Sequence, residues 1–463
     1  MNSFFKPTDI AYLVFFRIVF GILCIAEGIS LFSYLHLYKR AFDPELFHFK
    51  YYGFEWVHPM PDPFMSIFFV LLILAGVGIM LGWRYRWCML FYAFGFSYTF
   101  YMEAGFYLNH GYLFMMLCFS MLFFPAHRAY SLDVLQERVT PIKGAPRWPL
   151  LFLRFMMAVV YIYGGIAKIN ADWLNAVPLK YWLAGKSKLF LIGPVVKLEQ
   201  TAWFMSYGGL ALDLLVVPFL LIKKTRPWAF GCVLFFHFVN LLIFEIGIFP
   251  WMSTALTALY FSPDFPKRLW NWLSSKIKKL QSVGQWWQQL WAPSLDRQIE
   301  FHYSSLQKKL ITTSLIVFCS IQLLLPLRHH LYNSHVLWTE QGHRYSWRMM
   351  LRSKQGRGHF KVVDKATSRN VTVNIRKYVS KRQARKVYMH PYFILQVAHM
   401  LREEYKKEGM VDPEVYADLK LRVNGRPYQQ YVNPNIDLAK EKWSIFRSVD
   451  WLEPYEDLNR NEN

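Results

Sequence analysis

The chain has 463 residues, of which 54% are hydrophobic, 19% aromatic and only 18% charged, and it carries a net charge of +22. In an ordinary soluble domain about a quarter of all residues are charged, so this composition argues against a wholly soluble protein. The positive charge favours anionic lipid headgroups over nucleic acid as the acidic partner, because the apolar runs need a bilayer.

Apolar runs recur along most of the chain, and a helix needs about 17–25 residues to cross a bilayer. Gly247 and Pro250 interrupt one pair of runs, which can therefore form a broken or re-entrant element. We predict a mainly α-helical, polytopic membrane bundle of eight or nine spans within residues 1–262 and 310–339. The candidate spans are 9–34, 64–82, 88–103, 108–125, 149–169, 201–222, 228–244, 247–262 and 310–327.

Basic residues in the connections predict the orientation of the bundle. With nine spans and a cytoplasmic N-terminus, the inner segments hold 18 Lys and Arg residues and the outer loops hold 7. Positive residues collect on the cytoplasmic side of membranes, so this bias supports a cytoplasmic N-terminus. Everything after residue 328 is then expected on the exoplasmic side.

Residues 263–309 read differently from the spans on either side. Five tryptophans alternate there with lysines at helical intervals, and no long apolar run develops. This pattern is typical of a helix that lies in the membrane interface, so we predict an interfacial anchoring segment. All five cysteines of the chain fall inside apolar runs without metal-type spacing, and we predict no metal site.

The residue pattern changes from long apolar runs to alternating apolar and polar residues after the last span. The stretch "HFKVVDKATSRNVTVNI" contains two β-rich runs, and "PYFILQVAHMLREEYKKEG" has helical spacing. Asn424 and Gly425 suit a type I′ turn between two further strands. We therefore predict a small α+β domain over residues 340–463.

Several polar residues interrupt the apolar runs, where ionisable groups are costly and indicate function by default. Arg17 and Glu27 in the first run are expected to pair, and Asp213 in the sixth needs a hydrogen-bond partner. His237 and Asn240 lie three residues apart, on one helical face, and can address one cavity. Such a pair can equally serve as a contact between helices.

Lys168 stands in the last turn of the fifth run, close to Tyr163 and to Gly164–Gly165. A lysine at this depth can extend to water and act only as an anchor. Alternatively, burial favours its neutral amine, which can remove a proton from an acidic hydroxyl. Spacing alone leaves both interpretations open.

Six short motifs together resemble the vitamin K-dependent γ-glutamyl carboxylase family, whose prokaryotic relatives carry the same membrane unit, the HTTM domain. The likeness extends from about residue 6 to about residue 455. It implies an integral membrane protein, expected in a bacterial plasma membrane. The motifs are "NHGYLF", "HRAYSLD", "GGIAKINADWL", "FHFVNLLIFEIGIF", "LLLPLRHHL" and "YSWRMML".

The resemblance implies a lyase reaction coupled to epoxidation of reduced vitamin K or a menaquinol-type naphthoquinol. O2 and CO2 are then substrates, and a glutamyl peptide gains a γ-carboxylate. By motif, Lys168 matches the family's base and His110 its catalytic histidine, with Asn109 beside it. Further candidates for the quinol site are Tyr163, His237 and Asn240.

For the peptide, we expect Arg348 to bind a carboxylate, because a planar guanidinium binds carboxylates through two hydrogen bonds. His329 and Trp347 are further candidates for this substrate site. An alternative function is quinol epoxidation without peptide carboxylation. Another is a transporter or lipid-binding protein, against which the lack of a visible inverted repeat counts.

Overall fold

The predicted apolar runs form helices in the computed structural model, which describes residues 3–37, 46–188, 192–244, 246–332 and 334–457. Among these described residues, six helices are long and apolar enough to cross a membrane. The protein is thus a mainly helical membrane protein, while the predicted eight or nine crossings stay a prediction. The helices on the predicted runs are α1 (Ala11–Leu37), α2 (Phe64–Leu81), α3 (Tyr85–Met102), α4 (Asn109–Phe123), α6 (Trp148–Lys168), α10 (Glu199–Leu221), α11 (Arg226–Ile243), α12 (Phe249–Ala258) and α15 (Ser305–Leu324).

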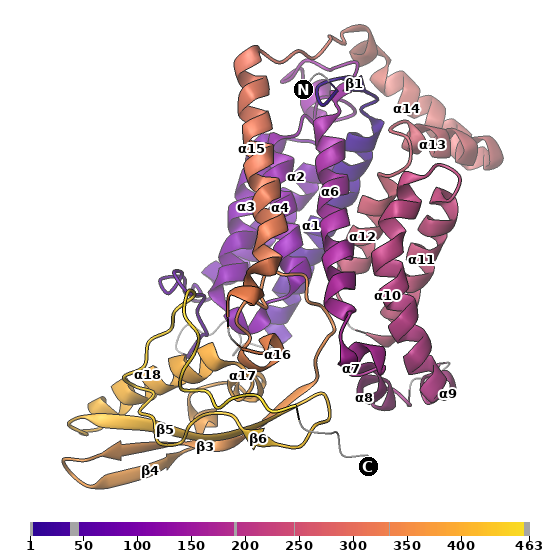
Figure 1. Ribbon diagram of the computed structural model, residues 1–463. Helices are drawn as coiled ribbons and strands as arrows, with labels where there is room; N and C mark the ends of the chain where they lie inside the picture. Colours follow the sequence, from indigo (N-terminus) through magenta and orange to yellow (C-terminus); the bar gives the residue numbers. More distant parts are fainter. Residues whose placement is uncertain (1–2, 38–45, 189–191, 245, 333, 458–463) are drawn as a thin grey trace.

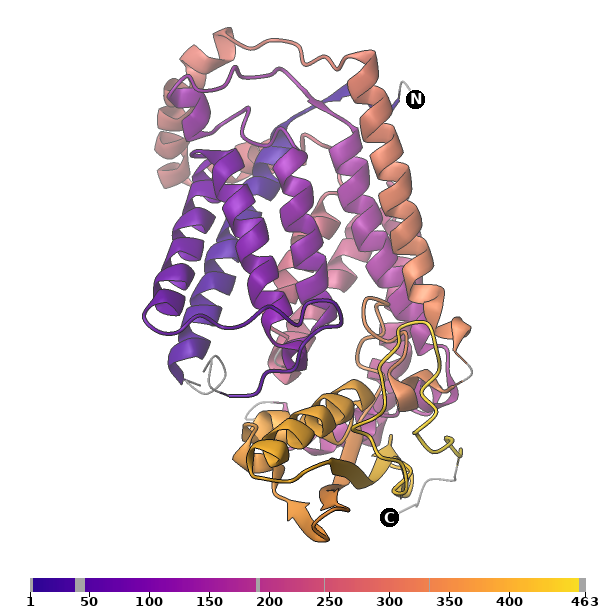
Figure 2. The same cartoon turned by 90° about the vertical axis from the view of Figure 1, so that its left-hand side faces the viewer.

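The helices run roughly parallel to one another in a single bundle, with α15 along its outer side (Figure 1). Helices α1 to α4 pack in chain order, and α6 and α10 to α12 form the other half (Figure 2). Glycine permits the closest approach, since a Cβ atom on Gly21 of α1 would lie 2.5 Å from the Cα atom of Met80 on α2. In lipid there is no hydrophobic driving force between helices, and small residues promote their association because they permit close van der Waals packing.

Two arginines, the buried Arg17 and the partly buried Arg154, bind backbone carbonyls at the end of the bundle near the N-terminus. Arg17 donates to the carbonyl oxygens of Ala126 at 2.8 Å and Ala129 at 3.0 Å. Arg154 donates in the same way to Leu259, at 2.8 Å. The expected pairing of Arg17 with Glu27 is therefore replaced by backbone contacts, which occupy the two terminal nitrogens of the guanidinium.

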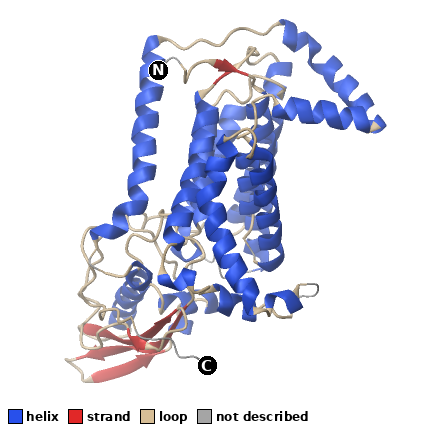
Figure 3. Cartoon of the chain, turned by 45° about the vertical axis from the view of Figure 1, so that its right-hand side comes forward, coloured by secondary structure: helices blue, strands red, loops and turns tan. Residues whose placement is uncertain are grey.

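Residues 263–309 contain two helices, α13 (Phe265–Lys276) and α14 (Lys278–Asp296). They cross the end of the bundle that is farthest from the C-terminal sheet (Figure 3). Trp272 and Trp286 are exposed there, at 57% and 58%. Exposed tryptophans at a bundle end suit a membrane interface, and the anchoring role stays a prediction.

The C-terminal part is a four-stranded antiparallel sheet in the order β4-β3-β5-β6. Alternate residues of β3, such as Phe360 and Val362, are buried on the face that α18 packs against. Asn424 and Gly425 follow β5 with φ angles of 53° and 80°, as the predicted turn requires. The elements are β3 (Lys354–Asp364), β4 (Arg369–Val373), α17 (Lys381–Val387), α18 (Pro391–Lys407), β5 (Pro413–Val423) and β6 (Gln429–Gln430).

One buried ion pair joins the sheet to the helical bundle. Asp172 lies in α7 (Ala171–Leu174), directly after α6, and accepts two hydrogen bonds from the Arg426 guanidinium at 2.9 Å each. Asn424 donates to the same carboxylate at 2.6 Å. The turn after β5 is thereby fixed beside the end of α6, where Lys168 stands.

Candidate functional site

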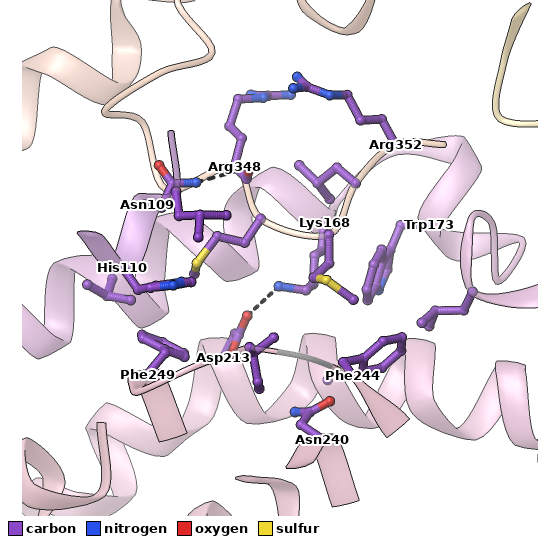
Figure 4. A pocket seen from close by; sticks show the side chains of 18 of the residues that line it. Asn109, His110, Lys168, Trp173, Asp213, Asn240, Phe244, Phe249, Arg348 and Arg352 are labelled. Carbon is purple, nitrogen blue, oxygen red and sulfur yellow. Dashed lines mark hydrogen bonds and ion pairs between the residues drawn. The ribbon is translucent and has the colours of Figure 1, made fainter. Parts of the chain in front are cut away.

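A cavity of about 450 Å³ lies at the end of the bundle that faces the C-terminal sheet. Helices α4, α6, α10 and α11 supply its walls, and the loop 343–352 covers one side (Figure 4). Most of its lining is apolar or aromatic. The polar lining residues are Asn109, His110, Lys168, Asp213, His237, Asn240, His343, Arg348 and Arg352.

Lys168 is buried in this cavity and paired with an acid. Its Nζ atom lies 2.5 Å from Asp213 Oδ2 on α10 and donates to the Gly164 carbonyl oxygen at 3.2 Å. The ammonium also lies 5.2 Å from the centre of the Trp173 ring. Lys168 is 6% exposed, so it does not extend to water as a surface anchor does.

The two glycines before Lys168 make this pairing possible. A Cβ atom on Gly164 would lie 3.1 Å from Asp213 Oδ2, and one on Gly165 would lie 2.7 Å from a Leu214 methyl carbon. Larger residues at these positions would therefore push α10 away from α6. A close contact between the helices brings a base and an acid together in a site of low dielectric, where a proton can pass between them.

His110 occupies the opposite wall, in the first turn of α4. The Phe249 ring lies between two histidines, with centroid distances of 5.9 Å to His110 and 5.7 Å to His237. Figure 4 shows His110 and Phe249 on the side of the cavity across from Trp173. The Lys168 amine thus lies between the Phe249 ring on one side and the Trp173 ring on the other (Figure 4).

His237 belongs to a hydrogen-bonded group in the cavity wall. Its Nε2 atom lies 2.9 Å from Ser253 Oγ, which in turn lies 3.0 Å from the Tyr161 hydroxyl. Its other ring nitrogen, Nδ1, is buried without a hydrogen-bond partner among the described residues. Asn240 lines the cavity from the same helix. His237 thus links α11 to α12 and α6 through its Nε2 atom.

Asn109 fixes the loop that covers the cavity. It accepts a hydrogen bond from Tyr107 at 2.7 Å and donates to the Arg348 carbonyl oxygen at 3.4 Å. The Tyr107 hydroxyl is in turn held by the Tyr345 amide at 2.5 Å. The Arg348 guanidinium points away from Lys168, toward Arg352, on the far side of the loop (Figure 4).

Three of the predicted site residues do not line this cavity. The Tyr163 hydroxyl donates to the Leu323 carbonyl oxygen of α15, at 2.5 Å. Trp347 is 1% exposed and its ring packs 5.4 Å from that of Tyr112. His329 stands behind the loop, with Nε2 3.3 Å from Arg348 Nη1.

The structure adds residues that the sequence did not assign to the site. Asp213 was noted as a buried acid, but its pairing with Lys168 was not predicted. Trp173, Phe249 and Arg352 also line the cavity. A usable signal for Asp213 existed, since charges inside membranes are usually paired. Within the described part of the chain, no cluster of His, Cys, Asp and Glu is arranged to hold a metal ion.

Comparison with known families gives two matches that together span most of the chain. The HTTM domain matches residues 5–265, which contain α1 to α12 and the lysine–aspartate pair. The lumenal domain of vitamin K-dependent gamma-carboxylase matches residues 307–458, which contain α15, the covering loop and the sheet. No solved structure matches the chain.

Proposed function

Because this chain belongs to the vitamin K-dependent gamma-carboxylase family, we propose that it is a membrane enzyme that couples quinol epoxidation to glutamate carboxylation. In this reaction a naphthoquinol, O2, CO2 and a glutamyl residue give the quinone epoxide, water, a γ-carboxyglutamyl residue and a proton. The observation that carries the proposal is the buried Lys168–Asp213 pair, which faces His110 across an apolar cavity.

The cavity fits a naphthoquinol in size and chemistry. Its volume of about 450 Å³ falls in the range of roughly 300–1,000 Å³ that small-ligand sites occupy. Phe249 and Trp173 offer aromatic rings to a bicyclic ligand, and His110 and Asn240 supply polar groups to the lining for its ring oxygens. The bound naphthoquinol supplies a reduced ring that reacts with O2.

Lys168 and Asp213 act together as the proton acceptor in this proposal. Asp213 first takes the ammonium proton of Lys168 across their 2.5 Å contact. The neutral amine then removes a proton from the quinol hydroxyl. The apolar lining keeps water away, so a strong base formed in the cavity is not quenched. His110 donates a hydrogen bond to the oxygen on which negative charge develops.

A peptide substrate reaches the cavity from the side of the C-terminal sheet, so the orientation of the bundle is part of the proposal. We expect the N-terminus and α13 in the cytoplasm and the sheet outside. In a background without the native cysteines, Ser368→Cys in the exposed turn after β3 should react with an impermeant maleimide on intact cells. Ser275→Cys, exposed on α13, should react only after permeabilisation. The reverse labelling pattern would invert this orientation.

A membrane assay with naphthoquinol, O2, labelled bicarbonate and a glutamyl peptide tests the activity itself. We expect the epoxide and peptide-bound label to form together, and both to require the quinol. Epoxide without incorporated label would select the alternative, a quinol epoxidase that does not carboxylate peptides. Absence of both products from folded protein would remove both activities and leave transport or lipid binding.

A further inference from the structure

The segment 340–354, which contains the loop that covers the cavity, carries more positive charge than its one acid can balance. Residues 340–354 contain four cations, Arg344, Arg348, Arg352 and Lys354, against one carboxylate, Glu340. Each buried cation is costly unless an acid or a set of acceptors satisfies it. The partners of the four cations therefore show whether the protein itself balances their charge or leaves one of them for a ligand.

Three of the cations have partners. Glu340 forms ion pairs with both Arg352 and Lys354, the second at 2.8 Å. Arg344 lies over aromatic rings, with distances to the ring centres of 4.9 Å for Tyr51 and 5.4 Å for Phe393. Cation–π contacts of this kind stabilise a partly desolvated guanidinium.

Arg348 is the exception. Its Nη1 atom donates to His329 Nε2 at 3.3 Å, because His329 Nδ1 is occupied by the Pro326 carbonyl oxygen at 2.9 Å. Its Nε atom is buried without a hydrogen-bond partner, and no carboxylate of the described residues lies within ion-pair distance. Arg348 is thus hydrogen-bonded to a neutral acceptor, and Glu340 acts on it only from beyond ion-pair distance.

Arg352 and His343 lie close to Arg348. The guanidinium of Arg352 points toward that of Arg348 (Figure 4). Burial lowers the pKa of Arg348, the charge of Arg352 lowers it further, and the charge of Glu340 opposes this shift in part. His343, 8% exposed, also has a buried Nδ1 atom without a hydrogen-bond partner among the described residues. Burial and the nearby arginines hold the pKa of His343 well below its usual value, so the ring stays neutral.

We propose that Arg348 and Arg352 form a carboxylate-binding subsite, separate from the Lys168 centre, for a second acidic side chain of the peptide substrate. A carboxylate between the two guanidiniums would accept hydrogen bonds from both and add a second negative charge to a group of cations that Glu340 balances only in part. The Arg348 backbone lies on the cavity while its guanidinium lies behind the loop. The target glutamate would therefore enter the cavity, while a neighbouring acidic residue of the peptide would bind Arg348 and Arg352 outside it.

This inference rests on the proposed glutamyl-peptide substrate, and a binding measurement tests it without turnover. Two fluorescent peptides would be compared on the full-length protein in nanodiscs, one with a single glutamate and one with a second glutamate close by in place of glutamine. The wild type should bind the diacidic peptide roughly tenfold or more tightly, as expected for a hydrogen bond between charged groups. Arg348→Gln should remove this preference, whereas Arg376→Gln, an exposed arginine of the C-terminal part, should keep it.

Equal binding of the two peptides by the wild type would overturn the subsite, as would an unchanged preference in Arg348→Gln. Arg348→Lys separates charge from geometry, because an ammonium cannot donate two parallel hydrogen bonds and should restore only part of the preference. Thermal unfolding identifies a variant that has lost its fold, and Arg352→Gln then replaces it in the comparison. If the carboxylation assay fails while the binding preference holds, the proposed activity falls and the subsite stands.

Discussion

Replacement of Lys168 by alanine is expected to abolish quinol epoxidation while the protein still folds in the membrane. General-base catalysis contributes roughly 10²- to 10⁴-fold to a rate, and the variant has no amine to take the quinol proton. Asp213 would remain in the cavity, but its carboxylate would lose the cation 2.5 Å away that now balances it. The measurement is epoxide formation per folded protein in nanodiscs.

Lys197→Ala is the matched control, because Lys197 is exposed and lies in the segment between α6 and α10. It should leave epoxidation unchanged. A small amine added to the Lys168→Ala variant should restore part of the rate, since the removed side chain leaves space beside Asp213. If Lys168→Ala retains near-wild-type epoxidation, the lysine is not the base, and the proposed proton path is refuted.

His110→Ala should lower the turnover number by roughly 10²- to 10³-fold, the usual effect of removing one donor to a developing oxyanion. Quinol binding should fall much less, because the Phe249 and Trp173 faces remain in the cavity. Steady-state kinetics and a direct quinol-binding measurement separate these two effects. The asymmetry follows from a donor that acts mainly in the transition state.

His359→Ala is the corresponding control, since His359 is exposed on β3. The His359→Ala variant should keep the wild-type turnover number and quinol affinity. Equal losses of quinol affinity and turnover in His110→Ala would instead indicate that the histidine only maintains the packing against Phe249. His110 would then be removed from the catalytic group, although Lys168 could still act as the base.

The helical bundle could be predicted from the sequence because apolar length is a local property of the chain. Each predicted run lies on a helix, from α1 to α15. The number of crossings could not be settled in the same way. Helix α12 has only ten residues, and a helix of that length rises about 15 Å. Its membrane position depends on its neighbours, which local apolarity does not encode.

The site was predictable one residue at a time, but its contacts were not. Lys168 and His110 followed from motifs, and both line the cavity. The partner of Lys168 comes from α10, 45 residues away, and depends on the glycines that let the two helices meet. The direction of the Arg348 side chain depends on the loop hydrogen bonds, which are also nonlocal. Hydrophobic pattern carries no information about either contact.

The Asp172–Arg426 pair has a consequence for how this architecture can diverge. Breaking such a buried pair is costly, although Arg426 also pairs with Asp457 at 2.7 Å and Asp172 also accepts a hydrogen bond from Asn424. Asp172 and Arg426 are 7% and 9% exposed, so water compensates poorly for a change at either position. The membrane half and the sheet half are therefore expected to evolve together at this contact. A chimera that takes the two halves from different parents would need matched residues at both positions.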